Sequence, residues 1–445
     1  MVVMKFGGTS VQNNIWIDKA LNIAESQLDR APVLVSSAMG KTTDCILELI
    51  ELAESGRMED SVRPFEELKS IHLQAAYSFL SAGNLKECED KLHILFSDFI
   101  SFLKGLSLLR ECSARSRDAL LSFGERLSTT IITHRAIERN IETTLLDART
   151  FMLTDENFNA AVPRMEETME LIKTKVKPAA GKLIVTQGFI AATENGVTTT
   201  LGRGGSDYSA AIIGAALNAE EIQIWTDVNG IMSSDPRFVK GVKTIASITY
   251  AEAGELAYFG AKVVHPATIQ PAVGNRIPVL VKNTGAPEHP GTTIEHKLSG
   301  TGLKAIASKK GITLINISSS KMLNAYGFLS RIFAIFEKHK TPVDLISTSE
   351  VSVSITIENC DSLEAITEEI SSIASVSVEQ GNSIICLVGQ DLWKDSRFIS
   401  KVFASLEDTP VRMISLGSSD INLSVVVPQE KTDSTIQTLH DAFLG

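Results

Sequence analysis

Two glycine-containing segments carry the residue types that could bind an anion. The first, Lys5-Phe-Gly-Gly-Thr-Ser10, lies between an apolar stretch and an amphipathic one. Glycines let backbone N–H groups approach an anion, and the N-terminus of a following helix adds a favourable partial charge. Lys5 would add a mobile cation over phosphate oxygens. The same segment also fits an ordinary strand-to-helix turn with a surface lysine.

The second segment, Leu201-Gly-Arg-Gly-Gly-Ser-Asp207, places three glycines around one arginine. Such a run can form a backbone nest for an anion, and a guanidinium group is suited to a carboxylate. Asp207 is an acid that could orient an ammonium group or a metal ion. The alternative is a glycine turn followed by a capping aspartate.

A third polar segment, Thr226-Asp-Val-Asn-Gly230, ends an apolar run and is followed by Asp235-Pro-Arg237. The carboxyl ends of parallel strands are where α/β sheets bind ligands. Lys262 and His265, further along, are weak evidence for a binding site by themselves, because single lysine and histidine residues are usually solvated or structural.

Two common nucleotide motifs are not supported. Gly40-Lys-Thr42 resembles the end of a P-loop, but that pattern requires glycine at position 35, which is valine here. No G-x-G-x-x-G follows the first apolar run, so a dinucleotide site is not indicated.

These segments need a scaffold, and the first two-thirds of the chain alternates apolar runs with amphipathic stretches. This alternation predicts an α/β domain with a mainly parallel sheet. Residues 44–140 show no clear strand and predict a helical part. Strands are expected at 2–6, 32–36, 144–146, 183–186, 222–226 and 278–281, and helices at 16–28 and 206–217.

A turn-rich stretch, Asn283–Gly291, marks a boundary, and the sequence beyond it repeats. Residues 343–347 match 411–415 at an offset of 68, and residues 353–357 match 423–427 at an offset of 70. A match between residues 330–333 and 400–403 shares the offset of 70. Two copies of a small βαββ-type module are therefore predicted; the alternative is chance similarity between apolar strands.

Composition limits the class of protein. The 445 residues predict two to four domains, 44% are hydrophobic, and the net charge of −11 argues against nucleic-acid binding. The five cysteines are scattered and show no C-x-x-C pairing, as in a cytoplasmic protein with reduced thiols. We find no signal peptide, and stretches such as 210–217 are too short to span a membrane.

Several motifs together resemble the aspartate kinases of the amino-acid kinase family. They occur in the family's order across nearly the whole first domain, and the repeats resemble the paired ACT domains of the same family. The motifs are Lys5–Val11, Ser122–Ser128, Val185–Phe189, Thr199–Tyr208, Trp225–Gly230, Asp235–Arg237 and Phe259–Pro266.

The resemblance implies a three-layer amino-acid kinase domain over residues 1–295, followed by two ferredoxin-like βαββαβ modules. These would span 303–378 and 379–445, unless the last segment completes the first module. The implied activity is transfer of the γ-phosphate of ATP to L-aspartate, the first step of the pathway to lysine, threonine and methionine. Mg²⁺ would bridge the phosphates, with no protein metal site expected.

The resemblance also assigns residues. Lys5 and Asp207 would be catalytic, and Glu125 with Asp207 would bind the ammonium group of aspartate. The remaining substrate-binding residues would be Ser36, Thr42, Phe189, Arg203, Gly204, Gly205 and Ser206. ATP would contact Lys5, Phe6, Gly7, Gly8, Thr226, Asp227, Met232, Arg237, Lys262 and Val263. Asn229 replaces an expected proline, and Met232 replaces an expected aromatic residue.

The first repeat resembles the effector site of lysine-inhibited aspartate kinases. Asp344 and Glu350 supply anionic partners for a cationic effector, although both would also suit solvated turns. Backbone groups near Gly327 would bind its carboxylate, and Ala325 replaces an expected serine. The implied lysine-binding residues are Met322, Ala325, Gly327, Phe328, Leu329, Val343, Asp344, Thr348, Ser349 and Glu350.

The family's regulatory modules pair between subunits, so a homodimer or a dimer of dimers is expected. Two other functions are considered. One is an amino-acid kinase acting on glutamate, acetylglutamate or a nucleotide; the Gly202–Asp207 segment and the repeats argue against it. The other is a non-catalytic amino-acid sensor on a kinase-like scaffold; the presence of Lys5, Glu125 and Arg203 argues against it.

Overall fold

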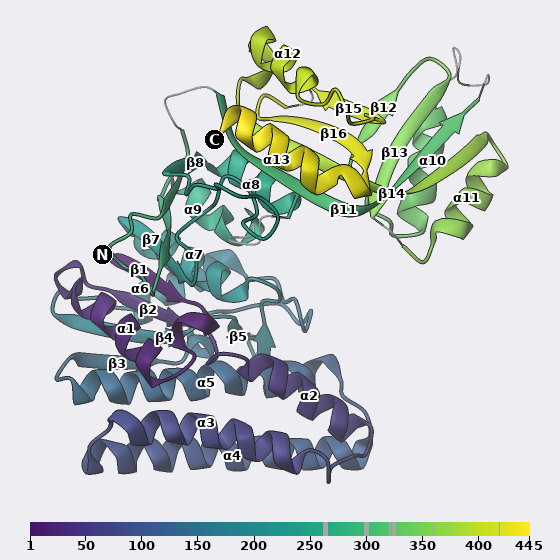
Figure 1. Cartoon of the computed structure of the whole chain (residues 1–445). Helices are drawn as coiled ribbons and strands as arrows, with labels where there is room; N and C mark the ends of the chain where they lie inside the picture. Colours follow the sequence, from purple (N-terminus) through teal and green to yellow (C-terminus); the bar gives the residue numbers. More distant parts are fainter. Residues whose placement is uncertain (261–265, 298–301, 320–321, 323–325, 359, 418) are drawn as a thin grey trace. The chain divides into compact units, whose positions relative to one another are not determined.

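A computed structural model describes residues 1–260, 266–297, 302–319, 322, 326–358, 360–417 and 419–445. The chain forms two compact units. The first contains residues 1–231 and 264–296, and the second contains residues 232–263 and 297–445 (Figure 1).

The first unit is built on a mainly parallel sheet with the strand order β3-β4-β2-β1-β7-β9-β10. Every pairing from β3 to β9 is parallel, and only β10 runs antiparallel, against β9. The strands are β1 (Val2–Phe6), β2 (Val33–Ser36), β3 (Glu142–Leu146), β4 (Lys182–Gln187), β7 (Glu221–Thr226), β9 (Val279–Asn283) and β10 (Thr292–Glu295).

Helices cover both faces of this sheet. Val2, Met4 and Phe6 of β1 pack into one core with α1 (Asn14–Glu25) and α5 (Ala114–Glu138). Side chains alternate along a strand, so Lys5 points to the opposite face, where α7 (Gly205–Leu217) packs on β1. α6 (Met165–Lys175) and α9 (Gln270–Gly274) flank α7. The expected three layers are present (Figure 1).

The helical stretch expected between residues 44 and 140 contains α2 (Thr42–Glu54), α3 (Val62–Phe79), α4 (Ala82–Leu109) and α5. α4 is long and apolar enough to pass a length-and-hydropathy test for a membrane span. Buried residues on one face of α4, among them Phe99 and Leu103, share a core with α2 and α5, whereas Phe102 and Leu108 of the same helix are exposed.

Short elements complete the first unit. The antiparallel pair of β5 (Ile190–Ala192) and β6 (Thr198–Thr200) leads into the glycine loop before α7. The 3₁₀ helices are η1 (Gly8–Val11), η2 (Leu28–Arg30), η3 (Ala148–Thr150) and η4 (Pro266–Ile269).

The second unit contains a six-stranded sheet with the order β12-β13-β11-β14-β16-β15. Its strands are β11 (Gly302–Ser318), β12 (Ile346–Thr348), β13 (Ser352–Glu358), β14 (Ser375–Gln390), β15 (Met413–Leu416) and β16 (Asn422–Pro428). Its helices are α8 (Tyr250–Tyr258), α10 (Phe328–Lys338), α11 (Leu363–Ser371), α12 (Ser396–Ala404) and α13 (Thr432–Phe443), with β8 (Ser247–Thr249), η6 (Leu392–Lys394) and η7 (Gln429–Lys431).

Two long strands join the repeats into one sheet. The second half of β11, residues 312–318, pairs with β13 and with the start of β14. The first half of β11, residues 302–310, pairs with the end of β14, which also pairs with β16. The strand that completes the second module therefore comes from the segment before the first module.

Each half of the sheet has its own core. Ile332 of α10 and Ile366 of α11 pack with Ile355 of β13. Val402 of α12 and Leu439 of α13 pack with Leu423 of β16. The sequence left open whether the last segment returns to the first module, but α13 lies in the second core. The predicted boundaries of the two regulatory modules, residues 303–378 and 379–445, stay a prediction.

All five cysteines are free; Cys88 and Cys386 are buried, and the other three are half-buried. Burial raises the pKa of the Cys88 and Cys386 thiols to about 12. These thiols are therefore protonated and unreactive near neutral pH.

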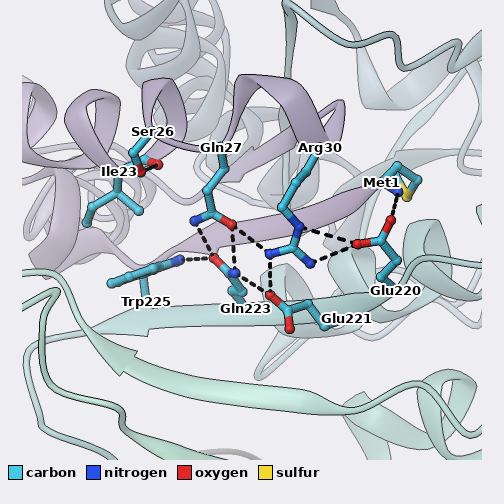
Figure 2. Close-up of polar contacts among 9 residues, drawn as sticks. All are labelled: Met1, Ile23, Ser26, Gln27, Arg30, Glu220, Glu221, Gln223 and Trp225. Carbon is cyan, nitrogen blue, oxygen red and sulfur yellow. Dashed lines mark hydrogen bonds and ion pairs between the residues drawn. The ribbon is translucent and has the colours of Figure 1, made fainter.

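A polar network ties the end of α1 to β7 in the first unit (Figure 2). Gln223 Oε1 accepts hydrogen bonds from Trp225 Nε1 at 3.0 Å and Gln27 Nε2 at 3.1 Å, and Gln223 is buried. Arg30 pairs with Glu220 and Glu221 at the rim of the same network.

Gln223→Met should lower the free energy of unfolding by about 1–3 kcal/mol, because it leaves the buried indole N–H of Trp225 without a hydrogen-bond partner. Arg30→Met, the matched control, removes half-exposed ion pairs and should cost less than about 1 kcal/mol. Urea unfolding followed by tryptophan fluorescence measures both. Equal losses would contradict this ranking.

Candidate functional site

The two glycine-containing segments meet at the carboxyl edge of the parallel sheet. Lys5 Nζ lies 2.7 Å from Asp207 Oδ1, and both side chains are largely shielded from solvent, with exposed fractions of 13% and 12%. Lys5 comes from the end of β1 and Asp207 from the first turn of α7. An ion pair therefore links the two predicted anion-binding loops.

The loop after β1 is held by the neighbouring strand. Gly7 N–H and the Ser10 hydroxyl both donate to the carbonyl oxygen of Trp225, each at 3.1 Å. A Cβ at Gly8 would lie 2.9 Å from the Gly40 carbonyl oxygen, so only glycine allows the loops after β1 and β2 to approach. The loop is thus fixed before any anion arrives.

The loop before α7 depends on left-handed backbone. Gly202 has a φ of 71° and Gly204 a φ of 72°, a region that disfavours residues with a Cβ. A Cβ at Gly205 would lie 2.8 Å from the Phe189 ring. Arg203, between these glycines, is exposed and forms no ion pair within the described part of the chain. Its guanidinium is therefore free for a ligand.

Glu125 lies on α5 and is buried, 3% exposed. Its Oε1 accepts the Ala38 N–H at 3.1 Å, and its Oε2 has no hydrogen-bond partner among the residues described. Burial raises the pKa of Glu125 to about 8, although the Ala38 N–H opposes the shift. The free oxygen of this buried carboxyl group can accept a hydrogen bond, and its ionised form, which becomes the main form above a pH of about 8, can receive a cation.

Serine side chains connect Glu125 to the Asp207 loop. Ser37 Oγ donates to Ser206 Oγ at 2.9 Å, and Ser37 directly precedes Ala38. The predicted Ser36 hydroxyl instead lies 3.1 Å from Ser128 Oγ in the interior, and Thr42 begins α2 and is buried. Ser37 was missed in the sequence, where it is one more small residue after a strand.

The turn after β7 lies at the same carboxyl edge of the parallel sheet. The Thr226 hydroxyl donates to the exposed Asp227 carboxylate, and Asn283 donates to Asn229 Oδ1 at 2.7 Å. Asn229, at the position where proline is expected, thus contributes a side-chain acceptor that holds the turn to β9.

These groups form one constellation of charges within the first unit. Lys5 and Arg203 can bind anions, and Glu125 and Asp207 can bind an ammonium group. Such a set suits a zwitterionic amino acid placed beside a phosphate, with catalysis by positioning and charge neutralisation.

Comparison with known families agrees with this arrangement. Residues 1–283 match the amino acid kinase family, and residues 315–368 and 385–443 match an ACT domain. The lysine-sensitive aspartokinase 3 of Escherichia coli is 36% identical over 99% of this chain and 98% of its own length. Aspartokinase 2 of Arabidopsis thaliana is also 36% identical, over 99% of this chain and 84% of its own length.

The chain belongs to the aspartokinase family.

A solved aspartokinase has the same fold. The E. coli aspartokinase III complex with aspartate and ADP has a TM-score of 0.85 at 35% identity and full coverage of both chains. Its complex with lysine and aspartate has a TM-score of 0.81 at 34% identity, again with full coverage of both chains.

Four further nucleotide-binding residues are expected of an aspartokinase. Met232 and Arg237 belong to the second unit. There Met232 Sδ accepts from the Thr244 hydroxyl, and the exposed Arg237 pairs with Asp235 at 2.6 Å. Lys262 and Val263 lie outside the described residues.

The regulatory modules of this aspartokinase-family chain contain a cavity of about 450 Å³ in the first repeat. Its lining includes most of the predicted effector residues, and Ser330 in addition. The lining residues are Met322, Gly327, Phe328, Leu329, Ser330, Thr348, Ser349 and Glu350. Gly327 is the N-cap of α10 with a φ of 76° and no side-chain cap, so backbone N–H groups there can bind a carboxylate.

Three predicted effector residues are not in that lining. Val343 packs at the edge of the first regulatory core, and Asp344 is engaged with Lys309 at 2.7 Å. Ala325 lies outside the described residues. The roles of Val343, Asp344 and Ala325 stay predictions.

Proposed function

We propose that the chain transfers the γ-phosphoryl group of ATP to the side-chain carboxylate of L-aspartate, giving ADP and 4-phospho-L-aspartate. The observation that carries this proposal is the Lys5–Asp207 ion pair, at 2.7 Å on the carboxyl edge of the sheet. It joins the loop expected to meet phosphates to the loop expected to hold the amino acid.

The chemistry requires little from the protein beyond charge and position. The reference pKa of an aspartate side chain is about 3.9, so the nucleophile is already ionised at neutral pH and no general base is needed. The obstacle is repulsion between two anions. Lys5 would neutralise charge on the transferring group, and Arg203 would hold the α-carboxylate of the substrate.

Within the part of the chain that is described, no group of three or more His, Cys, Asp or Glu side chains could hold a metal ion. Mg²⁺ bound mainly by phosphate oxygens and water fits this donor set, because it needs only one or two carboxylates. Asp207 or the exposed Asp227 would supply them. When bound, Mg²⁺ would neutralise phosphate charge.

We also propose that L-lysine binds the cavity in the first repeat and lowers activity. Its carboxylate would meet the uncapped N-terminus of α10, and Glu350 offers an exposed carboxylate for an ammonium group. In the second repeat the corresponding helix, α12, is capped by Asp395, so an anion there would meet a carboxylate. Pairing of the regulatory sheets would give a homodimer or a dimer of dimers.

The test is aspartate-dependent ADP production from Mg·ATP, with hydroxylamine to trap the acyl phosphate. Hydroxamate should form with L-aspartate, not with glutamate or acetylglutamate, and should fall as lysine is added. Hydroxamate that ignores lysine would overturn only the effector assignment. A folded protein without aspartate-dependent turnover would contradict the kinase assignment.

Glu125 predicts a pH dependence. Its ionised form must receive the substrate ammonium, so below the pKa of about 8 the KM for aspartate should rise about tenfold per pH unit. Because the folded chain favours the neutral form, that contribution to stability is complete below 4.5 and is lost as the pH rises through about 8.

Glu125→Gln should raise the KM for aspartate about 10–100-fold at pH 8, remove this pH dependence and slightly stabilise the fold at high pH. Glu138→Gln, on the same helix but exposed, is the matched control. Steady-state kinetics across pH 6–9 measure both, and an unchanged pH profile in Glu125→Gln would refute the role.

A further inference from the structure

Residues 232–244, in the second unit, form a loop whose two ends are fixed to each other. Met232 and Thr244 pair as an antiparallel bridge. One residue further in, the Ser233 N–H donates to the Lys243 carbonyl oxygen at 2.8 Å, and the Lys243 N–H donates to Ser233 Oγ at 2.9 Å. The 232–244 loop therefore has a defined shape of its own.

This loop is built onto the second repeat. The Ile306 N–H of β11 donates to the Ser233 carbonyl oxygen at 2.8 Å, and the Ser234 hydroxyl donates to the Ile306 carbonyl oxygen at 2.8 Å. Val239, further along the loop, is buried in the core of the second repeat, which also contains Leu439 of α13. The loop is therefore anchored to the regulatory sheet and to its core.

The C-terminal helix α13 and the residue after it bind the loop with polar contacts. Gln437 Oε1 accepts the Lys240 N–H at 2.8 Å, and Gln437 Nε2 donates to the Lys240 carbonyl oxygen at 3.4 Å. Lys243 Nζ donates to the carbonyl oxygen of Leu444 at 2.9 Å. Both the outer part of the loop and its returning arm are thus tied to the end of the chain.

His440 makes the buried contact of this set. Its Nε2 lies 2.9 Å from Ser233 Oγ, and both side chains are buried. Burial lowers the pKa of His440 below its ordinary value, with Asp441 opposing the shift and Lys243 reinforcing it, so the ring is neutral near neutral pH. Because Ser233 Oγ already accepts the Lys243 N–H, its own proton is available for Nε2 of the neutral ring.

The imidazole ring is a costly choice for the core. Its other nitrogen, Nδ1, has no hydrogen-bond partner among the described residues. A buried polar atom without a partner costs about 1–3 kcal/mol, and an apolar ring of similar size would avoid that cost. What the imidazole of His440 adds is the contact with Ser233, so its role lies in holding the loop.

The 232–244 loop carries Met232 and Arg237, two residues expected to contact ATP in an aspartokinase. Their described polar partners lie within the loop itself: Met232 accepts from Thr244, and Arg237 pairs with Asp235. The position of both side chains therefore follows from the position of the loop, which the second repeat sets.

We propose that His440 is a positioning residue for ATP: through Ser233, it holds the 232–244 loop in the place from which the loop meets the nucleotide. The inference rests on the proposed function, in which the chain uses ATP. It gives the second repeat a part in nucleotide binding that requires no effector.

The expected defect is specific to ATP. A loop that is held for only part of the time lowers the fraction of enzyme able to bind nucleotide, and the KM for ATP rises by the same factor. Glu125 and Arg203, expected to bind aspartate, lie in the first unit. The KM for aspartate, and kcat at saturating ATP, should therefore change little.

The test compares three variants of the full-length chain by steady-state kinetics. His440→Phe fills the same space but offers Ser233 no acceptor, so it should raise the KM for ATP about 3–10-fold. His440→Gln keeps an acceptor oxygen and should stay within about twofold of wild type. Val402→Ala, on α12 in the same core, lowers stability without removing a hydrogen bond of the loop, and should leave the KM for ATP unchanged.

A double-mutant cycle separates the contact from general disturbance of the module. Ser233→Ala should raise the KM for ATP at least as much as His440→Phe, and adding His440→Phe to it should have no further effect, because the shared hydrogen bond is already absent. Calorimetric titration with Mg·ADP, without aspartate, checks that the shift lies in nucleotide binding.

A wild-type KM for ATP in folded His440→Phe would overturn the inference, and so would an equal rise in Val402→Ala or independent effects in the cycle. If His440→Phe does not fold, Ser233→Ala decides alone, since it removes a single oxygen atom. Wild-type enzyme without aspartate-dependent ATP turnover would instead refute the proposed function.

Discussion

The Lys5–Asp207 ion pair, at 2.7 Å, joins the two glycine loops of the first unit. The reaction brings together a phosphate and a substrate carboxylate, which repel each other, so a cation held at this point can offset that repulsion. Parallel strands place both loops on one edge of the sheet, and the side-chain alternation of β1 directs Lys5 towards α7. The loop after β1 is fixed by backbone hydrogen bonds from the Gly7 N–H to Trp225 and from the Gly40 N–H to Gly8, and the loop before α7 by a backbone hydrogen bond from the Leu201 N–H to Phe189. Little reorganisation is then needed when the charges of the reaction develop.

Much of this was predictable because strand ends and glycine clusters are local signals. The alternation of apolar runs gave the parallel sheet, and glycines around Lys5 and Arg203 indicated the two loops. Glu125 was different. It lies within a long helix whose sequence shows no functional pattern, so only the family resemblance pointed to it; its burial and raised pKa come from long-range packing. Ser37 gave no signal, because its contact with Ser206 joins residues far apart in the sequence.

The regulatory repeats show a second limit of sequence reasoning. The offsets of 68 and 70 residues correctly indicated two related modules. They could not reveal that β11 and β14 each run through both, because a strand of 17 residues with a bulge has the same local pattern as two shorter strands. Asp344 was predicted as an effector ligand from the family resemblance, which its charge supported only in part. Its engagement with Lys309 and Tyr258 depends on how α8 packs on the sheet, which the sequence does not show.

The most direct test of the account is the division of the Lys5 effect between kcat and KM. If Lys5 acts on transition-state charge, Lys5→Met should lower kcat about 10²–10³-fold while the KM values for ATP and aspartate change less than about tenfold. Lys182→Met, at an exposed lysine that starts β4, should leave both unchanged. A Lys5→Met enzyme with near-normal kcat and a raised KM would contradict the account, because the lysine would then serve only to bind substrate.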